Sequence, residues 1–298
     1  MRINPRQVEA FRNVMLSGSI TSAAEMMNVT QPAVSRLIRD FEFATELSLF
    51  DREGSRLLIR AEAIELYREV ERLYIGLDGI GRAADDIRTA KGKALRMVAV
   101  PSLASQCLQE VVADLAISHK SLSVVFDVES TAFVIDMMTS HQYDLGFAFG
   151  SPRLAGLPIE MLAEAYAVAA FPIDHEFAKH NFITVDMLAN TRLLLPGRKT
   201  PLRQALDAQC AATGFQISNA IETSIINCCG LAARGTGVAI VDPLIATEFS
   251  GTLLTRRIEP RISVTYVAVR PPNAPKSRLL ESIIDDARNT ITKALGPQ

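Results

Sequence analysis

Four polar side chains near the N-terminus have the chemistry to read the edges of DNA bases. Gln31, Ser35 and Arg36 lie on one side of a predicted helix, and Arg39 follows one turn later. Arginine binds guanine or phosphate, glutamine pairs with adenine, and serine bonds to either, so this side suits major-groove recognition. An ordinary solvated helix face has the same composition, so the surroundings of the helix must decide between the two interpretations.

The opposite side of this helix is apolar at the spacing of a helix that packs on a core. It consists of Val34, Leu37, Ile38 and Phe41. Pro32 is tolerated in the first turn, where backbone amides lack partners within the helix. Two shorter helices are predicted before it, near residues 5–16 and 21–27, and the three apolar sides can share one core. A short helix, a brief turn and a second helix with a polar outer side predict a helix-turn-helix.

A hairpin is predicted directly after these helices. Two short apolar runs between residues 47 and 60 flank a Glu-Gly-Ser turn, with Arg52 and Arg56 near its tip. Such a wing can place its arginines on phosphates beside the groove. The predicted DNA-binding residues are therefore Gln31, Pro32, Ser35, Arg36, Arg39, Arg52 and Arg56.

The most regular pattern in the chain lies within a helix predicted over residues 61–89. Apolar residues step by four and three through Leu66, Val70, Leu73, Leu77, Ile80, Ala84 and Ile87. A sustained seam of this kind indicates contact with a partner helix, and paired helix-turn-helix units need a two-fold axis to read two half-sites. We therefore expect a homodimer or a homotetramer. Packing of the helix on the protein's own body is the alternative.

Composition limits the class of protein. The 298 residues suffice for two or three domains, and a net charge of −2 excludes a protein that coats nucleic acid through overall charge. The N-terminus lacks the apolar core of a signal peptide, and no apolar run is long enough to span a membrane. We expect a cytoplasmic protein with no membrane contact.

Strands and helices alternate beyond residue 91 and predict parallel sheets covered by helices. We expect an α/β domain of two subdomains, the first over about 91–161 and 268–298 and the second over about 162–267. Ligands in such sheets bind beyond the carboxyl ends of the strands. Polar groups that follow predicted strands, with one apolar neighbour, form the candidate effector site: Ser102, Leu103, Ser130, Thr131, Arg198, Thr200 and Glu222. Hydroxyls and Arg198 suit a carboxylate, and Glu222 suits an ammonium or guanidinium; helix caps and a solvated charge are the alternatives.

The sequence gives little indication of redox, metal or catalytic chemistry. Cys228 and Cys229 are adjacent but form no CxxC pair, and His175 and His180 are five residues apart, which turns them off a common helix face. No Ser-His-Asp or carboxylate constellation indicates catalysis. We expect no enzyme activity, no metal and no cofactor.

The N-terminal third resembles the LysR-type transcriptional regulators. Three runs carry the resemblance: Gly18-Ser19-Ile20-Thr21-Ser22-Ala23-Ala24-Glu25, Thr30-Gln31-Pro32-Ala33-Val34-Ser35-Arg36 and Leu49-Phe50-Asp51-Arg52. The family usually continues the wing with a glycine that is missing from Ile59-Arg60-Ala61-Glu62-Ala63, so we expect a more continuously helical join. Runs at 76–80, 143–146, 222–223 and 237–243 are similar to the branch that senses lysine precursors and opines.

The resemblance implies a multidomain architecture: an all-α winged helix-turn-helix domain over residues 1–60, a dimerising linker helix over 61–90, and an α/β, two-subdomain, periplasmic-binding-protein-like effector domain over 91–298. It implies a bacterial transcriptional regulator that binds double-stranded promoter or operator DNA. Its expected effector is an amino acid, an opine or a related carboxylate, and RNA polymerase is a candidate partner. Two alternatives stay open: a cytoplasmic small-molecule binding protein or enzyme whose N-terminus only dimerises, and a redox sensor acting through Cys228 or Cys229.

Overall fold

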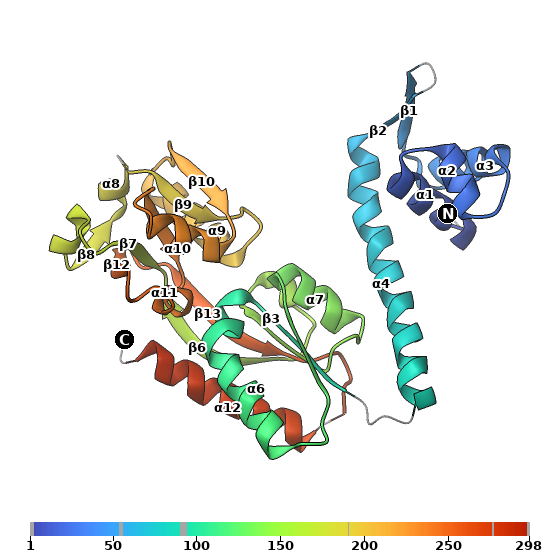
Figure 1. The fold of residues 1–298 in the computed structure, drawn as a ribbon. Coiled ribbons are helices and arrows are strands. Elements are labelled where there is room, and N and C mark those ends of the chain that lie inside the picture. The colour runs from blue at the N-terminus through green and yellow to red at the C-terminus, as the bar shows by residue number, and fades with distance from the viewer. Residues whose placement is uncertain (1–2, 54–55, 90–93, 190, 276, 297–298) are drawn as a thin grey trace. The chain divides into compact units, whose positions relative to one another are not determined.

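A computed structural model describes residues 3–53, 56–89, 94–189, 191–275 and 277–296 of the chain. The chain divides into two compact units, Met1–Thr89 and Ala90–Gln298. Figure 1 shows the mainly helical first unit in blue and cyan, and the second unit, built on two sheets, in green to red. No helix within the described ranges is long and apolar enough to cross a membrane.

Three helices and a hairpin precede one long helix in the first unit. The elements are α1 (Pro5–Ser17), α2 (Ile20–Met26), α3 (Gln31–Thr45), β1 (Phe50–Glu53), β2 (Arg56–Ile59) and α4 (Ala61–Thr89). The ring of Phe11 in α1 is completely buried and lies 5.1 Å from that of Phe41 and 5.9 Å from that of Phe50. One aromatic side chain therefore joins α1, α3 and the hairpin. The predicted helix-turn-helix and wing are confirmed.

The long helix α4 uses its apolar positions in two different ways. Val70 is buried in the core of the first unit, and Leu66 packs against that core. Leu73 and Ile80, further along, are 54% and 66% exposed. The prediction that these residues contact a partner helix is therefore wrong for the first turns of α4, which pack on α1. The short helices of this unit need α4 to close their core.

A polar contact fastens α4 to α1 beside this core. Arg12 Nε donates to Glu71 Oε1 at 2.7 Å, and the Arg12 guanidinium lies 4.1 Å from the centre of the Tyr74 ring. The hydrogen bond to Glu71 is the main cause of a raised pKa of Arg12. The linker helix and the helix-turn-helix therefore form one body over these turns.

Two mixed sheets make up the second unit. Its strands are β3 (Leu95–Ala99), β4 (Val124–Val128), β5 (Leu145–Phe149), β6 (Ile159–Tyr166), β7 (Val168–Pro172), β8 (Phe182–Thr184), β9 (Leu193–Pro196), β10 (Ala220–Thr223), β11 (Val238–Val241), β12 (Leu253–Glu259) and β13 (Ser263–Val269). The five-stranded sheet has the order β4-β3-β5-β13-β6, and the six-stranded sheet has the order β10-β9-β11-β7-β12-β8. The parallel pairs β3–β4, β3–β5 and β9–β10 agree with the predicted alternation.

Helices of this unit pack against both sheets. They are α5 (Pro101–Leu103), α6 (Gln109–Ser118), α7 (Thr131–Thr139), α8 (Val185–Leu188), α9 (Pro201–Thr213), α10 (Ile225–Ala232), α11 (Pro243–Thr247) and α12 (Arg278–Leu295). A π-helical turn, Ala104–Leu108, lies between α5 and α6, and two 3-10 turns cover Pro152–Leu154 and Glu176–Lys179. The closing helix α12 packs on β6 and α6 and so returns the chain to the five-stranded sheet.

The chain changes sheets at two places that the sequence pattern does not mark. Residues 161–171 contain the end of β6 and most of β7, which belong to different sheets on either side of Ala167. The return runs from β12 to β13, and β13 pairs antiparallel with β6 and β5. The predicted subdomain boundaries, 161/162 and 267/268, fall inside β6 and β13 and are corrected to the junctions that flank those strands. Apolar residues continue through the first junction without a Pro or Gly, so nothing local marks it.

Candidate functional sites

The recognition helix α3 presents its predicted reading side to solvent. Val34, Ile38 and Phe41 are buried and fix the rotation of the helix. The other side carries Gln31, whose Nε2 donates to Ser35 Oγ at 3.1 Å, and Arg36, which lies 3.7 Å from Asp40. Within the described part of the chain, these exposed side chains pair with one another and with Asp40, and a base edge or phosphate can replace such partners. Thr30 is the N-cap residue, but its side chain makes no capping bond.

A cavity of about 420 Å³ separates the recognition helix from the base of the wing. Its lining comprises Ile20, Gln31, Pro32, Ser35, Ile38, Arg39, Glu42, Phe50 and Leu57. Glu42 Oε1 accepts from the backbone amides of Leu49 at 2.7 Å and Phe50 at 3.2 Å. The sequence analysis missed this role of Glu42, which ties the start of the wing to the recognition helix. The carboxylate of Glu42, a few residues before the predicted hairpin, was the feature of the sequence that could have indicated this contact.

The wing arginines are placed only by their backbones. Arg52 lies in β1 opposite Leu57, and Arg56 lies in β2 opposite Glu53; their side chains fall outside the described residues. Arg60 follows β2 and contacts Asp51 at 3.2 Å and Glu62 at 3.4 Å. This double contact lets α4 begin at Ala61 almost directly after the wing, as expected from the missing glycine.

A cavity of about 260 Å³ lies in the second unit between the five-stranded sheet and helix α9. Residues from β5, β13 and the first turns of α9 line it: Phe149, Gly150, Pro152, Pro201, Leu202, Gln204, Ala205, Ser263, Val264 and Thr265. Phe149 and Thr265 belong to the five-stranded sheet, and α9 packs both on β9 of the six-stranded sheet and on β13 of the five-stranded sheet. We call this space the inter-sheet cleft. Its lining as described does not include the seven predicted effector residues.

Thr200 comes nearest to that cleft among the predicted residues. It is the N-cap of α9: its Oγ1 accepts from the Arg203 amide at 3.4 Å and donates to the Gly197 carbonyl at 2.8 Å. Pro201 and Leu202, which follow it, line the cleft. The sequence analysis placed this helix start correctly and missed Gln204, a polar side chain in the cleft, because single glutamines on helices carry no distinctive pattern.

The predicted residues after β3 and β4 lie at helix starts of the five-stranded sheet. Ser102 is 1% exposed and Leu103 is fully buried in α5; Ser130 is exposed and caps α7, and Thr131 is buried in its first turn. Ser102 Oγ donates its only proton to Asp242 Oδ2 at 2.6 Å. That proton is not free for an effector carboxylate, which the sequence analysis had assigned to it. Effector contact by these four residues stays a prediction.

Arg198 and Glu222 form an ion pair with each other. Arg198 Nε and Nη2 each lie 2.9 Å from Glu222 Oε1, and the almost completely buried Arg203 lies 3.2 Å from the same oxygen. These hydrogen bonds, with that of Arg198 first, lower the pKa of Glu222. The pairing follows from register, because Glu222 in β10 lies opposite Leu195 in β9, and Arg198 comes just after that strand.

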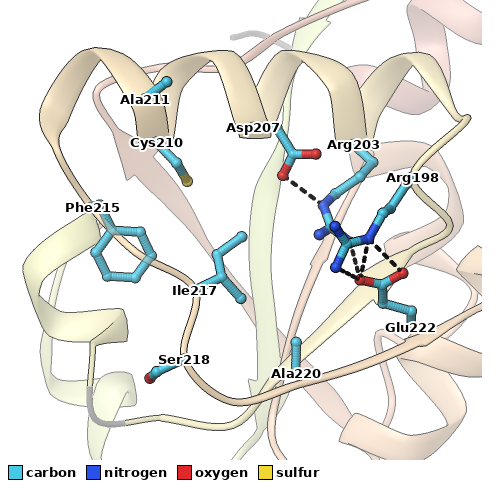
Figure 2. A pocket seen from close by; sticks show the side chains of 10 residues that line it. All are labelled: Arg198, Arg203, Asp207, Cys210, Ala211, Phe215, Ile217, Ser218, Ala220 and Glu222. Atoms are coloured by element: carbon cyan, nitrogen blue, oxygen red, sulfur yellow. Dashed lines mark hydrogen bonds and ion pairs between the residues drawn. The ribbon is translucent and has the colours of Figure 1, made fainter.

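Figure 2 shows this charged group at one end of a second cavity, of about 530 Å³, between α9 and β10. Asp207 accepts from Arg203 Nε at 2.7 Å, so the two cations and two carboxylates balance. Phe215 and Ile217 form the apolar end. The two predicted residues thus lie together here, apart from the lining of the inter-sheet cleft.

The adjacent cysteines have the properties of inert core residues. Cys228 and Cys229 are fully buried in α10 and make no disulfide. Burial raises the pKa of each thiol to about 12. At neutral pH only roughly one in 10⁵ molecules would carry the thiolate that reacts with peroxide. The structure therefore does not favour the redox alternative.

Comparisons with known proteins find matches to both units of the chain. The model of the bacterial regulatory helix-turn-helix protein, lysR family, matches residues 5–62, and that of the LysR substrate binding domain matches residues 89–291. Regulatory protein NocR of Agrobacterium tumefaciens (strain T37) is 32% identical over 280 residues, covering 93% of each chain. The octopine catabolism/uptake operon regulatory protein OccR of Rhizobium meliloti is 35% identical over 281 residues, covering 94% of this chain and 93% of OccR.

Solved structures match the fold along the whole length. Full-length CbnR in complex with its target DNA is 18% identical with a TM-score of 0.58, and covers 97% of this chain and 100% of CbnR. The two family models fall on the two units that the structure separates at Thr89. The helix-turn-helix, the linker helix and the two-sheet unit with its cleft are thus the parts of one known architecture, and the chain belongs to the LysR family of DNA-binding, effector-responsive transcriptional regulators.

Proposed function

We propose that the effector of this regulator is an opine or a related amino-acid carboxylate, bound in the inter-sheet cleft. The observation that carries the proposal is the cleft itself, which lies between β5 and β13 of the five-stranded sheet and the first turns of α9. The start of α9 attracts a carboxylate through the helix dipole, although its Arg203 and Gln204 amides already bond to Thr200. Gln204, Ser263 and Thr265 add neutral polar groups.

The size of the cleft and the relatives support the same class of ligand. About 260 Å³ lies just under the roughly 300–1,000 Å³ typical of small-molecule sites, which suits a compact ligand. OccR is named for the regulation of octopine catabolism and uptake. Octopine carries carboxylates and a guanidinium, the groups for which helix amides and neutral polar side chains provide partners. Arg198, exposed at the start of this region, can supply a further carboxylate contact by exchange with Glu222.

We also propose that two copies pair through α4 to read operator DNA. Leu73 and Ile80 lie seven residues apart on one side of the helix, and both are exposed apolar side chains. Their burial against a second α4 would follow the seam that the sequence predicts. Each copy would then place Gln31, Ser35 and Arg36 in a major groove, with Arg39 and the wing arginines on phosphates.

The effector proposal is tested by thermal unfolding of the full chain with octopine, L-arginine or L-lysine. A ligand that binds only the folded state raises the melting temperature, by an amount that grows with its concentration. We expect octopine to raise it, and Gln204→Ala to reduce that rise. Gln209→Ala, on the same helix but outside the cleft lining, should leave the rise unchanged. No rise with any of the three ligands, or equal rises in native and Gln204→Ala chains, would contradict the proposal.

A further inference from the structure

A fully buried carboxylate lies at the end of β11 and binds four donors. Asp242 Oδ2 accepts from Ser102 Oγ at 2.6 Å, and Oδ1 accepts from Tyr266 OH at 2.8 Å. Oδ1 also accepts from the backbone amides of Leu244 at 3.1 Å and Ile245 at 3.3 Å, which makes Asp242 the N-cap of α11. Oδ1 therefore accepts three hydrogen bonds and Oδ2 accepts one.

The donors come from both halves of the second unit. Tyr266 lies in β13, and Ser102 directly follows β3; both strands are in the five-stranded sheet. Asp242 ends β11 of the six-stranded sheet, and the two amides belong to the helix that it caps. We call the side chains of Ser102, Asp242 and Tyr266 the Asp242 joint, because their hydrogen bonds cross from one sheet to the other.

A second contact connects the same two segments. Thr247 Oγ1, at the end of α11, lies 2.7 Å from the Leu244 carbonyl and 2.9 Å from Gln106 Oε1, so its one proton is shared between these two acceptors. Gln106 lies in the π-helical turn that follows α5. π-Helical turns are rare in proteins, and those that occur often lie at functional sites. The segment after β3 is therefore held against α11 both at the joint and one turn beyond it.

The described contacts of the Asp242 carboxylate are all to neutral donors. Burial raises its pKa, and the hydrogen bonds of Ser102 and Tyr266 oppose that effect. A buried carboxylate without a cation depends on its hydrogen bonds, so loss of one donor leaves an unsatisfied oxygen in the protein interior. This dependence makes the joint sensitive to a small change in the separation of the two sheets.

We infer that Asp242 is a positioning residue for the effector response, because it holds the segment after β3 in place against α11. The inference rests on the proposed function, in which an effector in the inter-sheet cleft changes the placement of the two sheets. Asp242 is not among the residues that line the cleft. Replacement of Asp242 should therefore leave the affinity for the effector unchanged and abolish the change in DNA affinity that effector binding causes.

Hydrogen exchange of the full chain without effector tests the joint itself. Ser102→Ala should accelerate exchange of the Leu244 and Ile245 amides roughly five- to a hundred-fold. The Asp242 carboxylate accepts from these amides, and without the Ser102 hydroxyl it is no longer held in the position that bonds them. Ser102→Thr, which keeps the hydroxyl, should restore the native rates. Ser224→Ala is the matched control, since Ser224 caps α10 locally through the Asn227 amide at 3.3 Å. Native exchange of α11 in Ser102→Ala, or equal acceleration in Ser224→Ala, overturns the inference.

The response itself is tested with octopine and operator DNA. Where octopine raises the melting temperature of the native and Asp242→Asn chains alike, the ratio of DNA affinities with and without octopine should return toward one in Asp242→Asn. An unchanged ratio overturns the positioning role. Absence of any octopine effect on the native chain contradicts the proposed effector instead, and the exchange rates of α11 then decide the inference alone.

Discussion

Replacement of Arg36 by Ala is the most direct test of the recognition helix. Arg36 is 79% exposed, and it pairs with Asp40, which lies 3.7 Å away and is 51% exposed. An exposed pair of this kind contributes under about 1 kcal/mol, so little folding stability is lost on truncation. A bidentate contact to a guanine discriminates by about 1–3 kcal/mol. The expected loss of affinity for operator DNA is therefore roughly 5- to 150-fold.

Fluorescence anisotropy with two labelled duplexes measures this effect. One duplex carries the sequence upstream of the chain's own gene, and the other is a shuffled sequence of the same composition. We expect Arg36→Ala to weaken binding to the first duplex much more than to the second. Arg6→Ala removes one cation from α1, where Arg6 lies 3.7 Å from Glu9, and is the charge-matched control. Equal losses on both duplexes, with a salt slope lower by about 0.9, would show that Arg36 contacts phosphate and would refute base reading.

Four further predictions concern association, packing, strain and thiol chemistry. Leu73→Glu with Ile80→Glu should shift sedimentation toward the monomer, whereas Ile64→Glu, also exposed but on the opposite side of α4, should not. Gly237→Ala should lower the melting temperature by roughly 2–12 °C, because its Cβ would overlap the Arg192 carbonyl that accepts from Val238; Gly251→Ala, with open space around it, should not. Glu46→Gly should slow amide exchange at the end of α3 roughly two- to five-fold, because Glu46 has a φ of 56°. Cys228 and Cys229, with a pKa of about 12, should resist iodoacetamide until urea unfolds the chain, and Cys228→Ala with Cys229→Ala should leave the peroxide response of DNA binding unchanged.

The N-terminal unit could be predicted closely because its pattern is local. The stripe Val34, Ile38 and Phe41 fixes which side of α3 is buried within a few helical turns, and the structure buries all three. The long helix was predicted over residues 61–89 and is Ala61–Thr89. Its periodicity did not reveal whether each apolar residue contacts its own unit or a partner. Val70 and Leu73 belong to the same apolar repeat, but Val70 is buried and Leu73 is 54% exposed.

The candidate effector site shows where local pattern stops being informative. The sequence correctly placed Ser102, Thr131 and Thr200 at helix starts after strands, since caps and turn residues are short-range features. It missed α11 and β12, and with them Asp242, although an Asp before a Pro is a recognisable helix start. It assigned Arg198 and Glu222 to a ligand, which stays a prediction, and did not reveal that strand register pairs the two residues with each other.

The sequence by itself determined the family, the order of the domains and the reading side of α3, because these follow from residue types at short spacing. Only the tertiary structure decided which distant groups meet. β13 pairs with β6 about a hundred residues earlier in the chain, and this pairing brings Tyr266 beside Ser102 and Asp242. Such contacts depend on sheet order and on the crossing between sheets, which hydrophobic periodicity does not encode.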